Sequence, residues 1–104
     1  MVRYDESVLE YLDQLIYELY RNDYFSFIET AEEYVNKIID YVEVNIERLQ
    51  SRKSPAPLKI FGAYYISYNP NRRTTWYIFF EKKSDHYLVT SILNNYCEEA
   101  QWLS

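Results

Sequence analysis

The residues of this sequence best suited to binding phosphate are basic side chains near the turns of its second half. Arg72 and Arg73 follow an Asn-Pro-Asn turn, Lys82 and Lys83 begin the next turn, and Lys59 lies near the start of a predicted strand. The planar guanidinium group of arginine matches the geometry of a phosphate, and lysine adds a point charge. The pattern predicts a basic rim that binds nucleic acid. Solvated turn charges are the simpler alternative.

Cleavage of a phosphodiester in RNA requires a base for the 2′-hydroxyl, an acid for the leaving oxygen and cations for the phosphate. Histidine serves most often as the base, and His86 is the only histidine in the chain. Arg72, Arg73 and His86 are therefore candidate catalytic residues. His86 stands beside Asp85 at a turn, so an exposed turn histidine is the alternative reading.

Aromatic residues make up 19% of the chain, and thirteen of them are tyrosines. Tyrosine buries a ring and leaves a hydroxyl at the edge, which predicts an aromatic core with a polar rim. Six aromatic residues of the predicted strands could stack bases beside the basic rim, or could simply form the core: Tyr64, Tyr65, Tyr68, Trp76, Tyr77 and Tyr87.

Composition argues against other kinds of site. Cys97 is the only cysteine, so no internal disulfide can form and a site of His and Cys ligands is not expected. A single glycine is too few for the usual phosphate-cradling loop. We expect no cofactor and no metal. The sequence shows neither a signal-peptide pattern nor an apolar run of membrane-spanning length, so we expect a cytoplasmic protein that does not associate with a membrane.

Charge is distributed unevenly along the chain. Residues 1–47 carry twelve acids and three bases, whereas residues 48–83 carry eight bases and one acid. Residues 84–104 add three acids, which leaves a formal net charge of -5. Such asymmetry indicates either a surface for an anionic partner or two solvated faces of opposite sign.

The elements that must position these side chains begin with two helices. Apolar residues recur at helical spacing after Ser7, where Ser7 and Glu10 form a capping-box pattern and Asp5 is a rival cap. This first helix should end at Asn22-Asp23. A second capping-box pattern at Ser26 and Glu29 begins a helix that runs to about Gln50.

Beyond a linker at 51–57, which contains two prolines, the apolar period changes to two. We predict strands at 58–68, 74–81 and 87–93, with a short strand at 2–4 and a short terminal helix at 98–103. Trp76, Ile78 and Phe80 face one side of the middle strand, and apolar residues also face the other, which indicates a central strand. The expected fold is α+β, a helical hairpin packed on a small antiparallel sheet of three to four strands, in one domain spanning residues 1–104.

This order of elements, with Thr74–Lys83 followed by Tyr87–Asn95 as the final strands, resembles the RelE/ParE superfamily of bacterial type II toxins. The resemblance covers nearly the whole chain. It implies a toxin held inactive by a cognate antitoxin, acting either on translation through mRNA cleavage at the ribosome or on DNA gyrase. It also adds Tyr96, which follows the last strand, to the candidate catalytic residues.

The sequence departs from the pattern of the RelE-like ribonucleases. Tyr65 and Ser67 stand where those enzymes often carry lysines, and Trp76 or Thr75 stands where an arginine is expected. A non-catalytic module that binds protein or nucleic acid on the same scaffold is therefore the alternative function.

Overall fold

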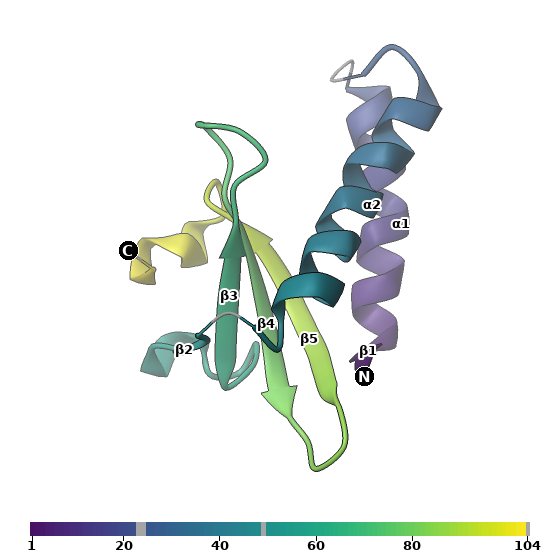
Figure 1. Cartoon of the computed structure of the whole chain (residues 1–104). Helices are drawn as coiled ribbons and strands as arrows, with labels where there is room; N and C mark the ends of the chain where they lie inside the picture. The colour runs from purple at the N-terminus through teal and green to yellow at the C-terminus, as the bar shows by residue number, and fades with distance from the viewer. Residues whose placement is uncertain (23–24, 49, 104) are drawn as a thin grey trace.

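Two helices and a five-stranded sheet form the fold of the computed structural model, which describes residues 1–22, 25–48 and 50–103 (Figure 1). The α+β class predicted from the sequence is confirmed. In chain order the elements are β1 (Val2–Tyr4), α1 (Glu6–Arg21), α2 (Ile28–Asn45), β2 (Arg52–Lys53), the 3₁₀ helix η1 (Ala56–Leu58), β3 (Tyr64–Tyr68), β4 (Trp76–Lys82), β5 (Tyr87–Asn94) and the 3₁₀ helix η2 (Glu98–Trp102).

Helix α1 begins at a carboxylate cap. The side chain of Asp5 accepts a hydrogen bond from the backbone N–H of Ser7 at 3.4 Å, so Asp5 is the N-cap and the predicted box of Ser7 and Glu10 is wrong. The predicted apolar stripe does turn inward, because Val8, Leu12 and Leu15 are buried. No helix in the described part of the chain is long and apolar enough to span a membrane.

Helix α2 begins without a side-chain cap. Its N-cap is Phe27, which corrects the predicted box of Ser26 and Glu29. The apolar period continues through Ile46, which is buried, but the helix ends at Asn45 and not near Gln50. The physical reason is a tight turn, in which the N–H of Arg48 donates to the carbonyl of Asn45 at 3.0 Å.

The sheet has five strands in the order β1-β5-β4-β3-β2. Strand β1 runs parallel to β5, whereas the other pairs are antiparallel, so the sheet is mixed and larger than the predicted antiparallel sheet of three to four strands. Strand β1 was predicted from the sequence. Strand β2 lies within the predicted linker, where Arg52 pairs with Tyr65 and Lys53 pairs with Tyr64 before Pro55 prevents further pairing.

The first long strand starts later than its period-two pattern suggests. Residues Ala56–Leu58 form η1, because Pro55 and Pro57 favour the tight turn, and β3 begins only at Tyr64. The buried side chain of Leu58 packs with Phe79 on the sheet, so the apolar character of this segment reflects burial rather than strand structure.

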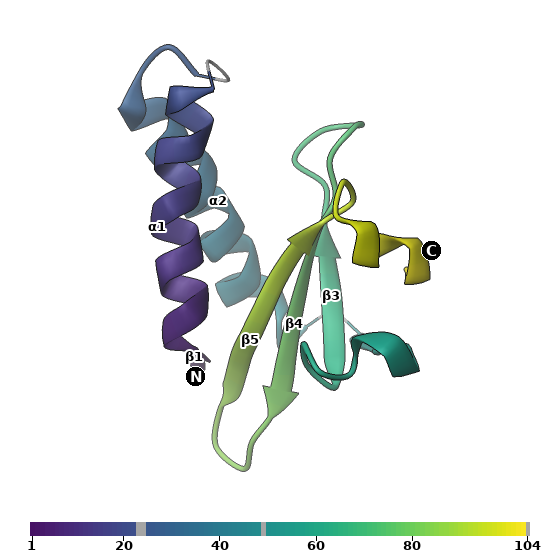
Figure 2. The same ribbon diagram turned by 180° about the vertical axis from the view of Figure 1, so that it is seen from behind.

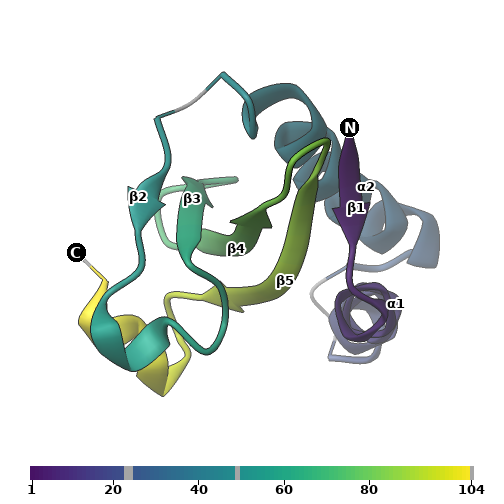
Figure 3. The same cartoon turned by 90° about the horizontal axis from the view of Figure 1, so that it is seen from below.

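Each face of the sheet is covered by different elements. Helices α1 and α2 cover one face, and η1 and η2 lie together on the other (Figures 2 and 3). The central strand β4 directs Trp76, Ile78 and Phe80 towards the helices and Phe79 towards the 3₁₀ helices, as its alternation predicts.

Candidate functional site

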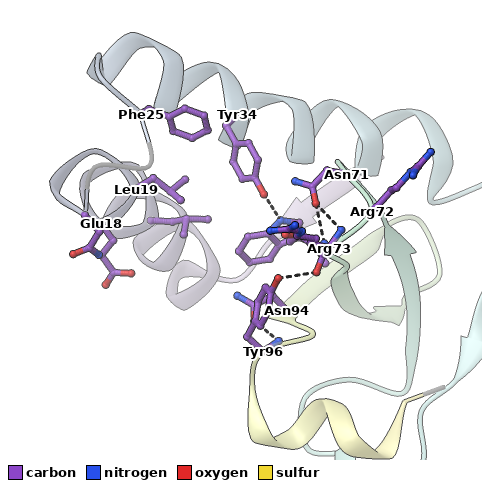
Figure 4. Close-up of a pocket in the computed structure, with 13 residues that line it drawn as sticks. Glu18, Leu19, Phe25, Tyr34, Asn71, Arg72, Arg73, Asn94 and Tyr96 are labelled. Carbon is purple, nitrogen blue, oxygen red and sulfur yellow. Dashed lines mark hydrogen bonds between the residues drawn. The ribbon is translucent and has the colours of Figure 1, made fainter.

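A cleft of about 860 Å³ separates the tip of the helical hairpin from the turn between β3 and β4. The end of α1, the start of α2 and the end of β5 complete its walls (Figure 4). Three of the predicted site residues, Arg72, Arg73 and Tyr96, lie together here. The remaining lining residues are Leu15, Glu18, Leu19, Asn22, Phe25, Tyr34, Asn71, Thr74, Trp76 and Asn94.

Asparagine side chains hold the arginine-bearing turn. The Oδ1 atom of Asn71 accepts hydrogen bonds from the backbone N–H groups of Arg73 and Thr74, both at 2.9 Å. Asn69 Nδ2 donates to Thr75 Oγ1 at 2.6 Å. Asparagine commonly fixes turns in this way, and here the result is a defined path for the backbone of Arg73.

The segment after β5 ties Tyr96 to the same turn. The carbonyl of Arg73 accepts a hydrogen bond from the Tyr96 hydroxyl at 2.8 Å and another from Asn95 Nδ2 at 3.0 Å. Asn95 Oδ1 in turn accepts from the N–H of Thr75 at 2.9 Å. The Tyr96 hydroxyl is thus engaged as a donor, although 68% of the residue's surface remains exposed. Its ring is available to a ligand.

The opposite wall is aromatic. Tyr34 on α2 accepts a hydrogen bond from the indole nitrogen of Trp76 at 2.9 Å, and the two rings meet edge to face with centroids 6.5 Å apart. The ring of Phe25 lies 5.5 Å from that of Tyr34. Burial raises the pKa of the Tyr34 phenol, so Tyr34 stays neutral at physiological pH.

Positive charge dominates the opening of the cleft. Arg72 and Arg73 are exposed, and neither guanidinium group forms an ion pair with any residue in the described ranges. Glu18 is the one carboxylate among the described lining residues, and it lies on the opposite wall from Arg72 (Figure 4). The arrangement can attract an anion at one wall while burying an apolar or aromatic group at the other.

The other candidate residues lie elsewhere. His86 and Lys83 occupy the turn between β4 and β5, at the far end of β4 from the cleft. Strand β4 has seven residues, which corresponds to about 20 Å. His86 Nδ1 is 2.6 Å from Asp85 Oδ1, and this hydrogen bond lowers the pKa of the Asp85 carboxyl. The structure therefore does not bring His86 together with the arginines.

The lysines are also dispersed. Lys82 lies over the ring of Tyr64 with its Nζ atom 4.2 Å from the ring centroid, near the far end of the sheet. Lys59 is exposed beyond η1. The five predicted rim residues therefore form no single surface patch around the cleft; only the two arginines line it.

Sequence reasoning missed the contribution of the helix tip. Glu18 and Tyr34 come from segments that the sequence marks only as helix, and Phe25 comes from the connection between the two predicted helices. Tyr34 follows Ala31 by three positions and so belongs to the inward-facing stripe of α2. This spacing was the feature of the sequence that could have identified Tyr34 as facing the sheet. No group of three or more His, Cys, Asp or Glu side chains among the described residues is placed to hold a metal ion.

The chain has no significant match among protein-family models, curated proteins or solved structures.

Proposed function

We propose that this protein is a toxin-like component of a bacterial type II toxin–antitoxin system that acts on translation by binding single-stranded RNA in the cleft. The observation that carries the proposal is the juxtaposition of Arg72 and Arg73 with the exposed ring of Tyr96 at the mouth of an aromatic cleft. Proteins bind single-stranded nucleic acid by combining cations for the backbone with aromatic rings for the bases.

The cleft favours binding over cleavage. The Tyr96 hydroxyl already donates to the carbonyl of Arg73, and His86 lies at the far end of β4. Among the described lining residues only Glu18 could accept a proton as a carboxylate, and it stands across the cleft from the arginine turn. We therefore propose that the protein blocks translation by occupying RNA and does not cut it.

The test is a charge-matched pair of double variants. Arg72→Ala with Arg73→Ala removes two cations from the cleft, and Lys59→Ala with Lys83→Ala removes two cations elsewhere. We expect the arginine variant to bind a short unpaired RNA roughly tenfold or more weakly. The slope of the logarithm of the binding constant against the logarithm of the salt concentration should become shallower by about 1.4, because each phosphate contact contributes about 0.7. The lysine control should bind like the parent.

The same variants should differ in their effect on cell growth. Expression of the parent alone should arrest growth, with amino-acid incorporation falling before DNA synthesis while mRNA stays intact, and the arginine variant should relieve the arrest. An early fall in DNA synthesis would indicate gyrase as the target. Equal RNA binding by the parent and both folded double variants would refute the assignment of the cleft.

Neutralisation by a cognate antitoxin is the second part of the proposal. Co-expression with the product of the neighbouring gene should restore growth and yield a stable complex on purification. Recovery of the chain alone, with growth still arrested, would count against an antitoxin partner.

A non-catalytic protein-binding module is the second candidate function. The apolar residues Leu15, Leu19 and Phe25 along one wall favour it, because an acidic peptide could place an apolar side chain there and its carboxylates on the arginines. In that case an acidic peptide with one aromatic residue would bind the cleft and RNA would not.

A further inference from the structure

A second pocket lies at the other end of the interface between helices and sheet. Its volume is about 410 Å³, and it is formed where α2 ends and the strands β2 to β5 begin or finish. Pockets that hold small ligands start at about 300 Å³, so a compact molecule fits. The lining residues are Ile46, Glu47, Gln50, Ser51, Lys53, Tyr64, Lys82 and Tyr87.

Strand register brings the lysines and tyrosines of this pocket to one face. Lys53 on β2 is the direct partner of Tyr64 on β3, and Lys82 on β4 is the direct partner of Tyr87 on β5. Directly paired residues project from the same face of a sheet. The Nζ atom of Lys82 lies 4.2 Å from the centroid of the Tyr64 ring, which joins the two pairs into one cluster. Cation–π contact of this kind holds an ammonium group in place.

The hydrogen-bonding groups of the cluster are mostly unused. Neither Lys53 nor Lys82 forms an ion pair with a residue in the parts of the chain that the structure describes. Within those parts the hydroxyls of Tyr64, Tyr87 and Ser51 make no hydrogen bond either. These five side chains therefore offer two cations and three neutral donors to one small space.

One carboxylate opposes this positive charge. Glu47 lines the pocket, but its Oε1 atom lies 3.5 Å from the amino nitrogen of Met1 and pairs with that group. The balance at the pocket therefore favours an anionic ligand. Two separated ammonium groups suit an anion with charge on several oxygens, because each lysine acts as a point charge and can reach a different oxygen.

We infer that this pocket binds the phosphate group of a small phosphorylated molecule, with Lys53 and Lys82 as the charged contacts and the Tyr64 and Tyr87 hydroxyls as further donors. A phosphate has the charge and the multiple acceptor oxygens that this donor set requires. The pocket is about 20 Å along β4 from the arginine cleft, so it is a separate site and does not depend on the proposed RNA binding.

The experiment uses inorganic diphosphate, glycerol phosphate and sulfate as probes, each at up to about 10 mM with ionic strength held constant by added chloride. The parent should be stabilised against heat by diphosphate and by glycerol phosphate, with sulfate weaker than diphosphate because sulfate carries less negative charge. Lys53→Ala with Lys82→Ala should weaken diphosphate binding at least tenfold. Lys59→Ala with Lys83→Ala has the same net charge and should bind diphosphate like the parent.

Mapping by nuclear magnetic resonance keeps the outcome interpretable. Backbone signals of residues 50–53, 64, 82 and 87 should shift on addition of diphosphate to the parent. Equal loss of binding in both double variants would show a general charge effect and overturn the site. So would stabilisation without shifts at these residues, or the absence of any stabilisation of the parent. Binding of diphosphate but not of glycerol phosphate would restrict the ligand to free polyphosphate and reject the monoester.

Discussion

At the scale of single residues, the hydrogen bond between Trp76 and Tyr34 connects the cleft to the core. Trp76 is almost fully buried, so its indole N–H needs a partner inside the protein, and Tyr34 on α2 supplies it across 42 positions of sequence. The same tyrosine forms the aromatic wall of the cleft. Tyr34 therefore both stabilises the fold and shapes the wall of the cleft.

The substitution Tyr34→Phe tests this bond. It keeps the ring and leaves the buried indole N–H of Trp76 unpaired, so the free energy of unfolding should fall by about 1–3 kcal/mol in urea denaturation. The control is Tyr77→Phe, because the hydroxyl of the half-buried Tyr77 makes no hydrogen bond with a described residue. Equal effects of the two substitutions would mean that the Trp76–Tyr34 bond contributes nothing specific.

At the scale of elements, the segment that connects η1 to β3 is fixed by its close approach to the sheet. Thr90 is the extra residue of a β-bulge, since Phe79 pairs with Ser91 and Phe80 pairs with Val89. The hydroxyl of Thr90 donates to the carbonyl of Phe61, which anchors the connecting segment on the bulge. Gly62 then passes directly over the central strand.

Gly62→Ala adds only one methyl group, but it should destabilise the protein strongly. A Cβ atom at position 62 would lie 2.8 Å from the backbone nitrogen of Phe80 and 2.9 Å from the Cβ atom of Phe79, and neither atom belongs to a movable side-chain end. We expect a loss of about 1–3 kcal/mol in the free energy of unfolding. Exposed Ser84→Ala should change it by less than about 0.5 kcal/mol. A stable Gly62→Ala protein would show that this segment can move away from β4.

Edge protection is another property of the elements. Strand β2 covers only Tyr64 and Tyr65 of β3. Further along the edge the hydroxyl of Tyr41 on α2 donates to the carbonyl of Ser67 at 2.7 Å, and the Tyr41 ring lies 4.5 Å from that of Tyr68. A helix side chain thus forms a hydrogen bond with a carbonyl at the sheet edge that could otherwise pair with a strand of another chain.

At the scale of the whole molecule, the packing of helices on the sheet buries tyrosines and thereby links stability to pH. Burial raises the pKa values of Tyr4, Tyr11, Tyr34 and Tyr41, with the nearby carboxylate of Glu43 adding to the effect at Tyr4. The pKa of Tyr11 rises from an ordinary value near 10.0 to about 12. All four phenols are thus neutral in the folded protein over a wider pH range than in the unfolded chain.

The free energy of unfolding should consequently decrease as the pH rises above about 10, because the unfolded chain releases these protons first, and the part that Tyr11 contributes should continue to fall until about 12. Below pH 10 the contribution of the tyrosines should be constant. Urea midpoints at pH 8, 10 and 11 measure the trend, and Tyr11→Phe should reduce its slope, since Tyr11 makes no hydrogen bond with a described residue that the substitution would remove. A slope unchanged by Tyr11→Phe would contradict the assignment to this phenol.

Much of the fold is determined by local sequence pattern. The helical stripe of Val8, Leu12 and Leu15 predicted α1, and the alternation around Ile78 and Phe79 predicted a central strand with two apolar faces. These patterns are readable because each side chain's direction follows from the backbone period alone. The position of Arg72 and Arg73 at a turn was predictable from the Asn-Pro-Asn sequence that precedes them.

Tertiary structure decided the pairing of β1 with β5, the strand at Arg52–Lys53 and the walls of the cleft. Each of these depends on contacts between segments far apart in the chain, such as Tyr34 with Trp76, and a local period carries no information about distant partners. The separation of His86 and Lys83 from the arginines follows instead from the order of the predicted strands. Successive turns of an antiparallel sheet lie at opposite ends of the strand that they share, so these bases are close in sequence and far apart in space.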